Sequence, residues 1–296
     1  THFSIEAYGE YLVIDTGYYK PNELNNARTA NAPAHNVILV DGAGAPRKGL
    51  LNDWGGADAY LRHTRDGQRL AYAEAHQRYE ATDFVRAMAF VRQRYFVVAD
   101  RLKVDGDQDR EYRWRLHAGV GRDFEGSSSF EGNRATLLAP TARLDVALGS
   151  TEGEVAFEAP PFEEDQAPYV HSINGHGHHD VLDGVLTARS PHFLSVLLPS
   201  PDGDNSLTIE AVQAPAGVVA WRVVGDAVDD LILLRSEGAP DVLSLGGRRV
   251  ETDAELALIS GDDAGLIASG SRLVVDGAVR VALDAPEPIH LWEPAN

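Results

Sequence analysis

The sequence predicts an all-β protein, a large antiparallel multi-stranded β-sandwich. Apolar residues recur with a period of two along most of the chain, which is the spacing of a half-buried strand. Glycine-containing turn signals separate the alternating segments. No segment of ten residues shows a convincing helical pattern, so a sandwich is favoured over an α/β fold.

Sixteen segments are expected to form strands because they are rich in Val, Ile, Tyr, Phe and Leu and mostly alternate with polar residues. The first five are Ser4–Asp15, Asn36–Val40, Arg69–Tyr79, Val85–Ala99 and Glu111–His117. The next seven are Ala135–Leu138, Arg143–Leu148, Leu186–Leu198, Ser206–Val212, Val218–Val224, Asp230–Arg235 and Leu256–Ile259. The last four are Gly265–Ile267, Arg272–Val275, Val279–Leu283 and Ile289–Trp292. Turns are expected at Asp41-Gly42, Asp66-Gly67, Asp105-Gly106, Glu131-Gly132, Pro201-Asp202-Gly203 and Asp276-Gly277.

Length and composition indicate a folded protein with a substantial core. The chain has 296 residues, 44% of them hydrophobic, and 28 Gly with 15 Pro, which excludes a disordered or low-complexity chain. No apolar run is long enough to span a membrane. Cysteine is absent, which excludes disulfides, Cys-zinc sites and thiol nucleophiles. We expect one β-sandwich domain over 1–296, and an acidic, Pro-rich stretch at 158–166 leaves a division into two β subdomains open.

The net charge of −19 argues against a nucleic-acid partner, which requires a basic surface. It also argues, at first sight, against a polyanionic substrate. The charge is segregated, however: residues 60–120 carry +3 and the rest of the chain carries −22. Because local potential governs what a cleft attracts, the total charge does not exclude a polyanion.

Alternation in Glu111–His117 places Tyr112, Trp114 and Leu116 on one face and Arg113, Arg115 and His117 on the other. Such a cationic row suits carboxylates or sulfates of a substrate. A solvated outer face, with Arg stems covering apolar surface, is the alternative.

Four segments carry a resemblance to a known family. His35-Asn36-Val37-Ile38-Leu39-Val40-Asp41-Gly42 is similar to the His-Asn-x-x-x-Val-Asp-Gly strand of the heparinase II/III-like polysaccharide lyases. The opening from Phe3 to Tyr18, with its Asp15-Thr16-Gly17 turn, resembles the family's first sandwich strand. The other two segments are Ala75–Tyr79 and Val91–Leu102. The resemblance covers roughly residues 1–120.

This resemblance implies an α/α toroid followed by a β-sandwich, with the active site between them. It implies β-elimination at a uronic acid: Asn or His groups neutralise the carboxylate, a Tyr or His removes the C5 proton, and the 4-linked sugar departs. We expect the toroid, and a catalytic His before the first strand, to lie upstream of this sequence, which alternates from Phe3 onward as if it began inside a strand.

The resemblance also implies a zinc ion bound by two His and one Asp. The matching positions are His35, Asp53 and His76, and imidazole with carboxylate is a reasonable donor set for zinc. A metal placed there is expected to brace the cleft. Without a metal, His35 would cap a strand, Asp53 would form an Asx turn and His76 would face solvent.

Further site residues are expected near these positions. Tyr60 and Tyr72 are candidates for the sandwich tyrosine that acts in elimination in some alginate lyases of the family, and a structural tyrosine is the alternative for each. Arg62 and His63, with Arg65, are candidates for binding the sugar carboxylates. Four histidines fall within 171–179, on a loop that is suited to a second metal, to substrate or simply to solvent.

We therefore expect the β-sandwich part of a lyase that acts, with its toroid, on an anionic polysaccharide such as alginate or a glycosaminoglycan. We expect a periplasmic or secreted location, with the cytoplasm as the alternative. Two alternative hypotheses remain. The chain could be a non-catalytic carbohydrate-binding sandwich, or a module that assembles with a separate toroid chain. Thr1 would permit an N-terminal nucleophile hydrolase, but the four-layer αββα pattern of that class is absent.

Overall fold

The structure of the protein, a computed structural model, describes residues 1–16, 31–46, 59–160, 169–172, 175–261 and 263–294. Within these ranges there are 24 strands and one short 3₁₀ helix, η1 (Ala32–Ala34). All pairs of strands are antiparallel, which confirms the all-β prediction.

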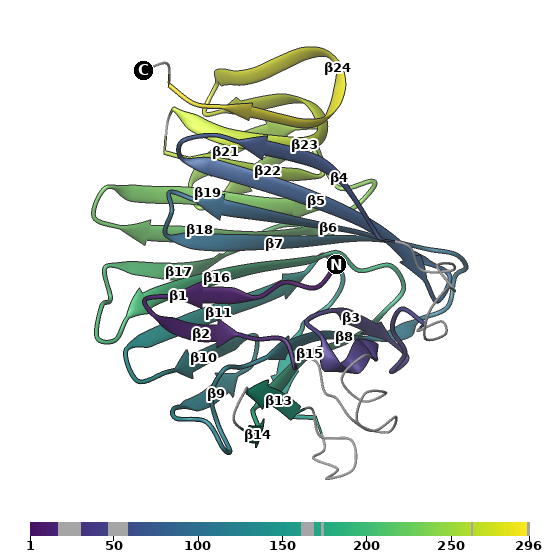
Figure 1. Ribbon diagram of the computed structural model, residues 1–296. Helices are drawn as coiled ribbons and strands as arrows, with labels where there is room; N and C mark the ends of the chain where they lie inside the picture. Colours follow the sequence, from purple (N-terminus) through teal and green to yellow (C-terminus); the bar gives the residue numbers. More distant parts are fainter. Residues whose placement is uncertain (17–30, 47–58, 161–168, 173–174, 262, 295–296) are drawn as a thin grey trace.

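The strands form three larger sheets and two hairpins (Figure 1). The four-stranded sheet has the order β12 (Ala156–Glu158), β15 (Val181–Ala188), β8 (Arg110–His117) and β3 (Ile38–Val40). The long sheet has the order β4 (Tyr60–Asp66), β5 (Leu70–Tyr79), β6 (Thr82–Val91), β7 (Tyr95–Val104), β16 (Phe193–Pro201), β11 (Ala142–Ser150), β10 (Arg134–Leu138) and β9 (Ser127–Glu131). The C-terminal sheet has the order β17 (Leu207–Val212), β18 (Val218–Gly225), β19 (Val228–Arg235), β22 (Leu256–Ser260), β23 (Ala264–Val275), β21 (Arg248–Thr252) and β20 (Val242–Leu245), and β24 (Ala278–Trp292) pairs with β23. The hairpins are β1 (Ile5–Ala7) with β2 (Glu10–Val13), and β13 (Tyr169–Ser172) with β14 (Gly175–His178).

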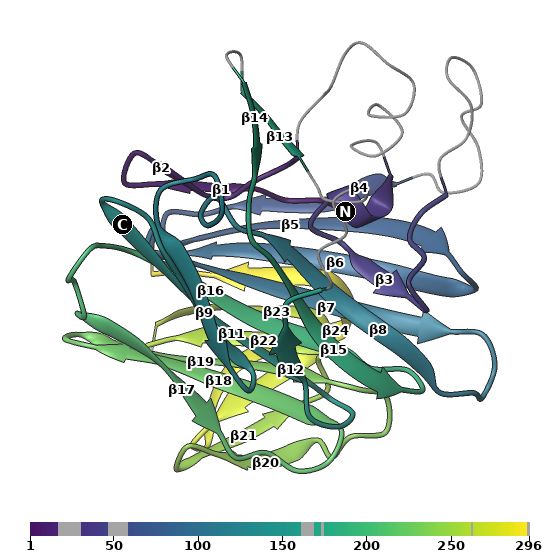
Figure 2. The ribbon, with the colours of Figure 1, turned by 90° about the horizontal axis from the view of Figure 1, so that it is seen from below.

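The long sheet is the central layer and is buried on both faces. One core lies between it, the four-stranded sheet and hairpin β1–β2, around Trp114, Tyr112 and Phe193. A second core lies between the long sheet and the C-terminal sheet, around Tyr95 and Trp221. A third core lies on the other side of the C-terminal sheet. In Figure 2 the hairpin β13–β14 projects from this body beside β1–β2.

Two of the predicted strands each correspond to a pair of strands in the structure. Ser4–Asp15 is a hairpin, because Tyr8 and Gly9 take positive φ angles of 55° and 81° and form a tight turn. Val85–Ala99 is likewise divided between β6 and β7 at Arg92-Gln93, both with positive φ. Neither Arg nor Gln is a usual residue for that conformation, so composition gives no signal for this turn.

The predicted apolar face of β8 is confirmed. Tyr112, Trp114 and Leu116 are fully buried in the first core, and Arg113 and Arg115 lie on the opposite face. Residues 161–166 of the predicted seam lie outside the described residues. The strands before and after these residues belong to the same two sheets, the four-stranded sheet and the long sheet. The change to the C-terminal sheet comes later, between β16 and β17.

Candidate functional site

Two histidines and an aspartate meet where hairpin β1–β2 joins the four-stranded sheet. His2 precedes β1, Asp15 follows β2 and His35 follows η1, so the hairpin brings the first two together. His2 Nε2 lies 3.2 Å from Asp15 Oδ2, and His35 Nδ1 lies 3.2 Å from Asp15 Oδ1. The cluster lines a cavity of about 320 Å³, together with Thr1, Gln77 and Tyr79 among others.

Asn36 holds the backbone on both sides of this cluster. Its buried side-chain amide donates to the carbonyls of Phe3 and Ile14, each over 2.8 Å, and its Oδ1 accepts the His117 N–H. Phe3 follows His2 and Ile14 precedes Asp15. One side chain therefore fixes the positions from which His2 and Asp15 project, which is how a site is preorganised.

Arg86 fixes the backbone beside His2 and beside His35. Its Nη1 donates to the carbonyls of Thr1 (2.8 Å) and Asn36 (2.6 Å), the residues next to His2 and His35. Its Nε and Nη2 form a bidentate pair with Asp100, which also accepts a hydrogen bond from Trp114 Nε1. Arg86 and Asp100 are both buried, so each charge depends on the other.

His2 is neutral at neutral pH. Burial lowers the pKa of His2 to about 4, although the charge of Asp15 opposes the shift. The Asn36 backbone N–H lies 3.1 Å from His2 Nδ1, which must accept this bond. A neutral ring that accepts at Nδ1 carries its proton on Nε2, so His2 donates to Asp15 in this arrangement.

The cluster can hold a metal ion through Asp15 and His35. Within the described part of the chain, His2, Asp15 and His35 are the group whose ligand atoms lie close enough together, within 4.8 Å of one another. An imidazole with a carboxylate fits zinc. His2 would join as a ligand only by giving up the Asn36 N–H bond, because a ring that binds metal at Nε2 must carry its proton on Nδ1.

The structure separates two of the three predicted zinc ligands, His35 and His76. Asp53 lies outside the described residues. His76 lies on the other face of the long sheet from His35, because Gln77 and Tyr79 of β5 line the His35 cavity and successive side chains of a strand point to opposite faces. Of the two predicted ligands that the structure describes, His35 belongs to the cluster and His76 does not.

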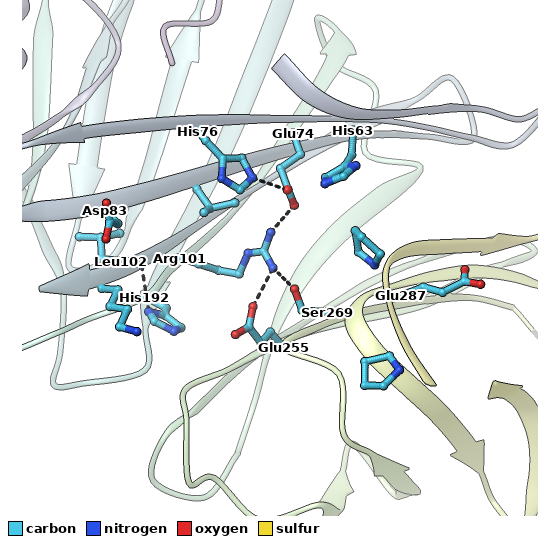
Figure 3. A pocket seen from close by; sticks show the side chains of 14 residues that line it. His63, Glu74, His76, Asp83, Arg101, Leu102, His192, Glu255, Ser269 and Glu287 are labelled. Atoms are coloured by element: carbon cyan, nitrogen blue, oxygen red, sulfur yellow. Dashed lines mark hydrogen bonds and ion pairs between the residues drawn. The ribbon is translucent and has the colours of Figure 1, made fainter. Parts of the chain in front are cut away.

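His76 instead faces a cleft between β4–β5 and β24, shown in Figure 3. Tyr60, His63, Tyr72 and His76 share this face through the β4–β5 register. His76 Nε2 lies 2.6 Å from Glu74 Oε1. Four of the candidate residues from the sequence thus share one face of the long sheet, and this face is opposite to the one that carries the His2–Asp15–His35 cluster.

Glu74 joins the long sheet to the C-terminal sheet through Arg101. Arg101 pairs with Glu74 and donates to Glu255 (2.7 Å) and Ser269 (2.6 Å) (Figure 3). Burial alone would raise the pKa of Glu74, but Arg101 and the bonds from His76 and Tyr72 lower it, so Glu74 is ionised at neutral pH. The side chains form a polar bridge between the two sheets.

The two candidate tyrosines differ in their exposure to solvent. Tyr72 is buried, its hydroxyl donates to Glu74, and burial raises its pKa well above the usual value. Tyr60 is 55% exposed. Only Tyr60 is thus placed where a polysaccharide could reach it.

The predicted cationic row is engaged within the fold. Arg113 pairs with Glu111, Glu158 and the buried Asp183, and Arg115 binds Asp183 through two bonds of 2.7 Å. His117 is fully buried and bonded to His179 and to the Pro33 carbonyl, which corrects its expected place on an exposed face. The geometry gives this row a bracing role, and substrate binding by Arg113 and Arg115 stays a prediction.

The remaining candidates lie at the sheet edge and on the projecting hairpin. Arg62 is exposed on β4, and Arg65 donates to the carbonyls of Thr64 and Ile289. His171 and His176 are cross-strand neighbours in β13–β14, whereas His179 is buried beside His117. Among the described residues, the cluster members missed by the sequence were His2 and Asp15, although Asp15 belongs to one of the segments that carried the resemblance.

His192 lines the same cleft and gives the fold a testable pH dependence. Burial lowers the pKa of His192 below its usual 6.5, and its Nδ1 accepts the Leu102 N–H over 3.2 Å. Since the folded state favours the neutral ring, its contribution is fully present above about pH 6.5 and is lost as the pH falls below that value. We expect the wild-type protein to lose more stability than His192→Gln between pH 7.5 and 5, measured by urea unfolding with chelator present. Equal losses would contradict this.

The comparisons with known proteins agree with this architecture. The family model described as "Heparinase II/III-like, C-terminal" matches residues 1–166. The heparinase III that is the BT4657 gene product has a TM-score of 0.60 and 11% identity, over 79% of this chain and 36% of that chain. The heparan sulfate lyase HepC from Pedobacter heparinus has a TM-score of 0.57 and 14% identity, over 88% and 36%. No curated protein matches the sequence.

At these identities the solved structures show a shared fold, and the chain spans about a third of their length. The family match is the stronger finding, because it covers more than half of the chain and contains every residue of the His2–Asp15–His35 cluster. The chain therefore belongs to the heparinase II/III-like family, as a C-terminal β-sandwich domain.

Proposed function

We propose that this chain is the β-sandwich part of a polysaccharide lyase that cleaves a uronic-acid polymer by β-elimination. The observation that carries the proposal is the His2–Asp15–His35 cluster, a neutral imidazole beside a carboxylate–imidazole pair in a cavity of about 320 Å³. Its backbone is fixed by Asn36 and Arg86, which a site for chemistry requires. Solved structures of similar fold include those of heparinase III and a heparan sulfate lyase.

Elimination requires that the sugar carboxylate be masked, because the C5 proton is weakly acidic until that charge is neutralised. Histidine N–H groups of the cluster would bind the carboxylate. Tyr60 lies on the other face of the long sheet, so a proton-abstracting group for this site would come from the cluster or from the toroid. A base then removes the C5 proton, the C4–oxygen bond breaks, and the departing oxygen takes up a proton. We propose that an α/α toroid supplies the other wall and part of these groups.

We also propose that zinc binds at Asp15 and His35, with His2 as a further ligand when its ring releases the Asn36 N–H. Zinc held there would add a fixed positive charge and brace the two loops that carry its ligands. His2, Asp15 and His35 orient one another without it through the contacts described above. The three side chains are therefore already held close together before a metal ion binds.

The reaction is tested on the protein in its full natural length. Purified enzyme is mixed with alginate, heparan sulfate and hyaluronan, and the ultraviolet absorbance of newly formed unsaturated uronate is followed. We expect absorbance to rise with at least one of the polymers. Flat traces with every uronate polymer, from protein that is folded by circular dichroism, would favour a carbohydrate-binding sandwich instead.

We propose a periplasmic or secreted location, where extracellular polysaccharide is met. No helix in the described part of the chain is both long and apolar enough to cross a bilayer. Cell fractionation with antibody detection tests the location. Recovery with the cytoplasmic fraction would overturn it.

A further inference from the structure

We propose that the cleft between β4–β5 and β24 binds an uncharged saccharide unit, at a site separate from the His2–Asp15–His35 cluster. The cleft has a volume of about 530 Å³, within the range of small-ligand sites. Its walls come from the long sheet and from the C-terminal sheet with β24, so it lies on the opposite side of the long sheet from that cluster. The inference does not depend on the lyase activity.

A β-bulge in β4 turns His63 into this cleft. Tyr60 pairs with His76 and Leu61 with Ala75, but Glu74 pairs with His63 because Arg62 is the extra residue. Regular pairing would have placed Arg62 opposite Glu74. Bulges re-aim side chains and occur often beside functional sites. The His63 and His76 rings lie edge to face, with centroids 6.3 Å apart.

The buried Arg101 leaves one donor unused in the cleft lining. Arg101 is only 7% exposed, and its two terminal nitrogens bond to Glu74, Glu255 and Ser269. Its Nε–H has no hydrogen-bond partner among the described residues. Because this nitrogen is itself buried out of contact with solvent, a ligand in the cleft would bond to the other lining groups and not to it. Figure 3 shows Arg101 reaching across the middle of the cleft between Glu74 and Glu255.

The lining offers donors and acceptors in the mixture that hydroxyl groups need. His192 Nδ1 accepts the Leu102 N–H, so the neutral ring carries its proton on Nε2, a donor. His76 uses Nε2 toward Glu74, which leaves Nδ1 for a ligand. Glu255 and Glu287 add carboxylate oxygens. A sugar hydroxyl both donates and accepts, and it can therefore satisfy either kind of partner.

Charge and apolar surface select against an acidic ligand. The lining carboxylates are Glu74, Asp83, Glu255 and Glu287, against the fixed cations Arg101 and Lys103. The excess of carboxylates over fixed cations disfavours uronates and sulfates. Pro286 and Pro288 give the β24 wall an apolar surface for the C–H face of a sugar ring.

The proposal is tested by titrating the protein with cellobiose, maltose and N,N′-diacetylchitobiose, with digalacturonate as the charged counterpart. Binding is measured by saturation-transfer NMR and calorimetry at pH 7.5. We expect saturable binding of at least one neutral disaccharide. His63→Ala should weaken it by at least about fivefold, the loss of one hydrogen bond. Thr64→Ala is the matched control, since Thr64 is an exposed neighbour on the other face of β4.

Three outcomes would overturn the proposal. They are no saturable binding by any neutral disaccharide, equal affinities for His63→Ala and wild type, and tighter binding of digalacturonate than of every neutral sugar. Because both substitutions lie on an edge strand with exposed neighbours, folding is checked by circular dichroism. A Thr64→Ala protein that weakens binding as much as His63→Ala would count against the site as well.

Discussion

Replacing Arg86 with methionine is expected to lower the free energy of unfolding by about 3–5 kcal/mol, the cost of breaking a buried ion pair from one side. The substitution leaves the Asp100 carboxylate buried, with the Trp114 N–H as its one remaining side-chain partner among the described residues. It also frees the carbonyls of Thr1 and Asn36, which Arg86 Nη1 binds. Urea unfolding followed by tryptophan fluorescence measures the change.

Arg78→Met is the matched control for this prediction. Arg78 lies on the preceding strand, pairs with Asp83 and Asp105, and is half exposed. Exposed pairs contribute about 0–1 kcal/mol, so Arg78→Met should cost little. If the two substitutions cost the same, the Arg86–Asp100 pair does not hold the backbone under the cluster.

His35→Ala is expected to abolish zinc binding. Removing a hydrogen-bond partner of a metal ligand costs about 10–100-fold in metal affinity, and removing the ligand itself should cost more. Asp15→Ala should behave in the same way, because both residues point at the same position. Zinc is measured by elemental analysis after dialysis against a competing chelator, with protein that was never exposed to chelator as reference.

His76→Ala is the control that separates the cluster from the ligand set suggested by the sequence. His76 faces the cleft and contacts Glu74, so its loss should leave the zinc content unchanged. Loss of zinc in His76→Ala together with retention in His35→Ala would contradict the assignment. His2→Ala should reduce affinity less than His35→Ala, because His2 must first give up the Asn36 N–H.

The fold class was predictable because period-two alternation is a local signal. In β8 it assigned each side chain to the correct face. Strand ends were less predictable where turns use residues without a turn signature, as at Arg92-Gln93. The short, exposed β4 and β9 carry too few apolar residues to be recognised, and β9 is a run of serines closed by Phe130 and Glu131.

The site was only partly predictable, because its residues come together through the topology. His35 and Asn36 stood out in the sequence, but the partner of His35 is Asp15, which arrives across hairpin β1–β2. The role of Arg86 depends on pairing between β6 and β7, which places Arg86 opposite Asp100. The family resemblance implied His76 as a ligand, yet strand alternation directs it to the other face of the sheet.

The most direct test compares the full-length protein with its Asp15→Asn variant in the ultraviolet assay for unsaturated uronate, on the polymer that wild type cleaves. The substitution keeps the size of the side chain but removes the charge that orients His2 and His35. We predict that wild type releases unsaturated product and that Asp15→Asn loses at least about 100-fold in rate, the scale set by one preorganised electrostatic contact. Wild-type protein that forms no unsaturated product, or a variant as active as wild type, would contradict the account.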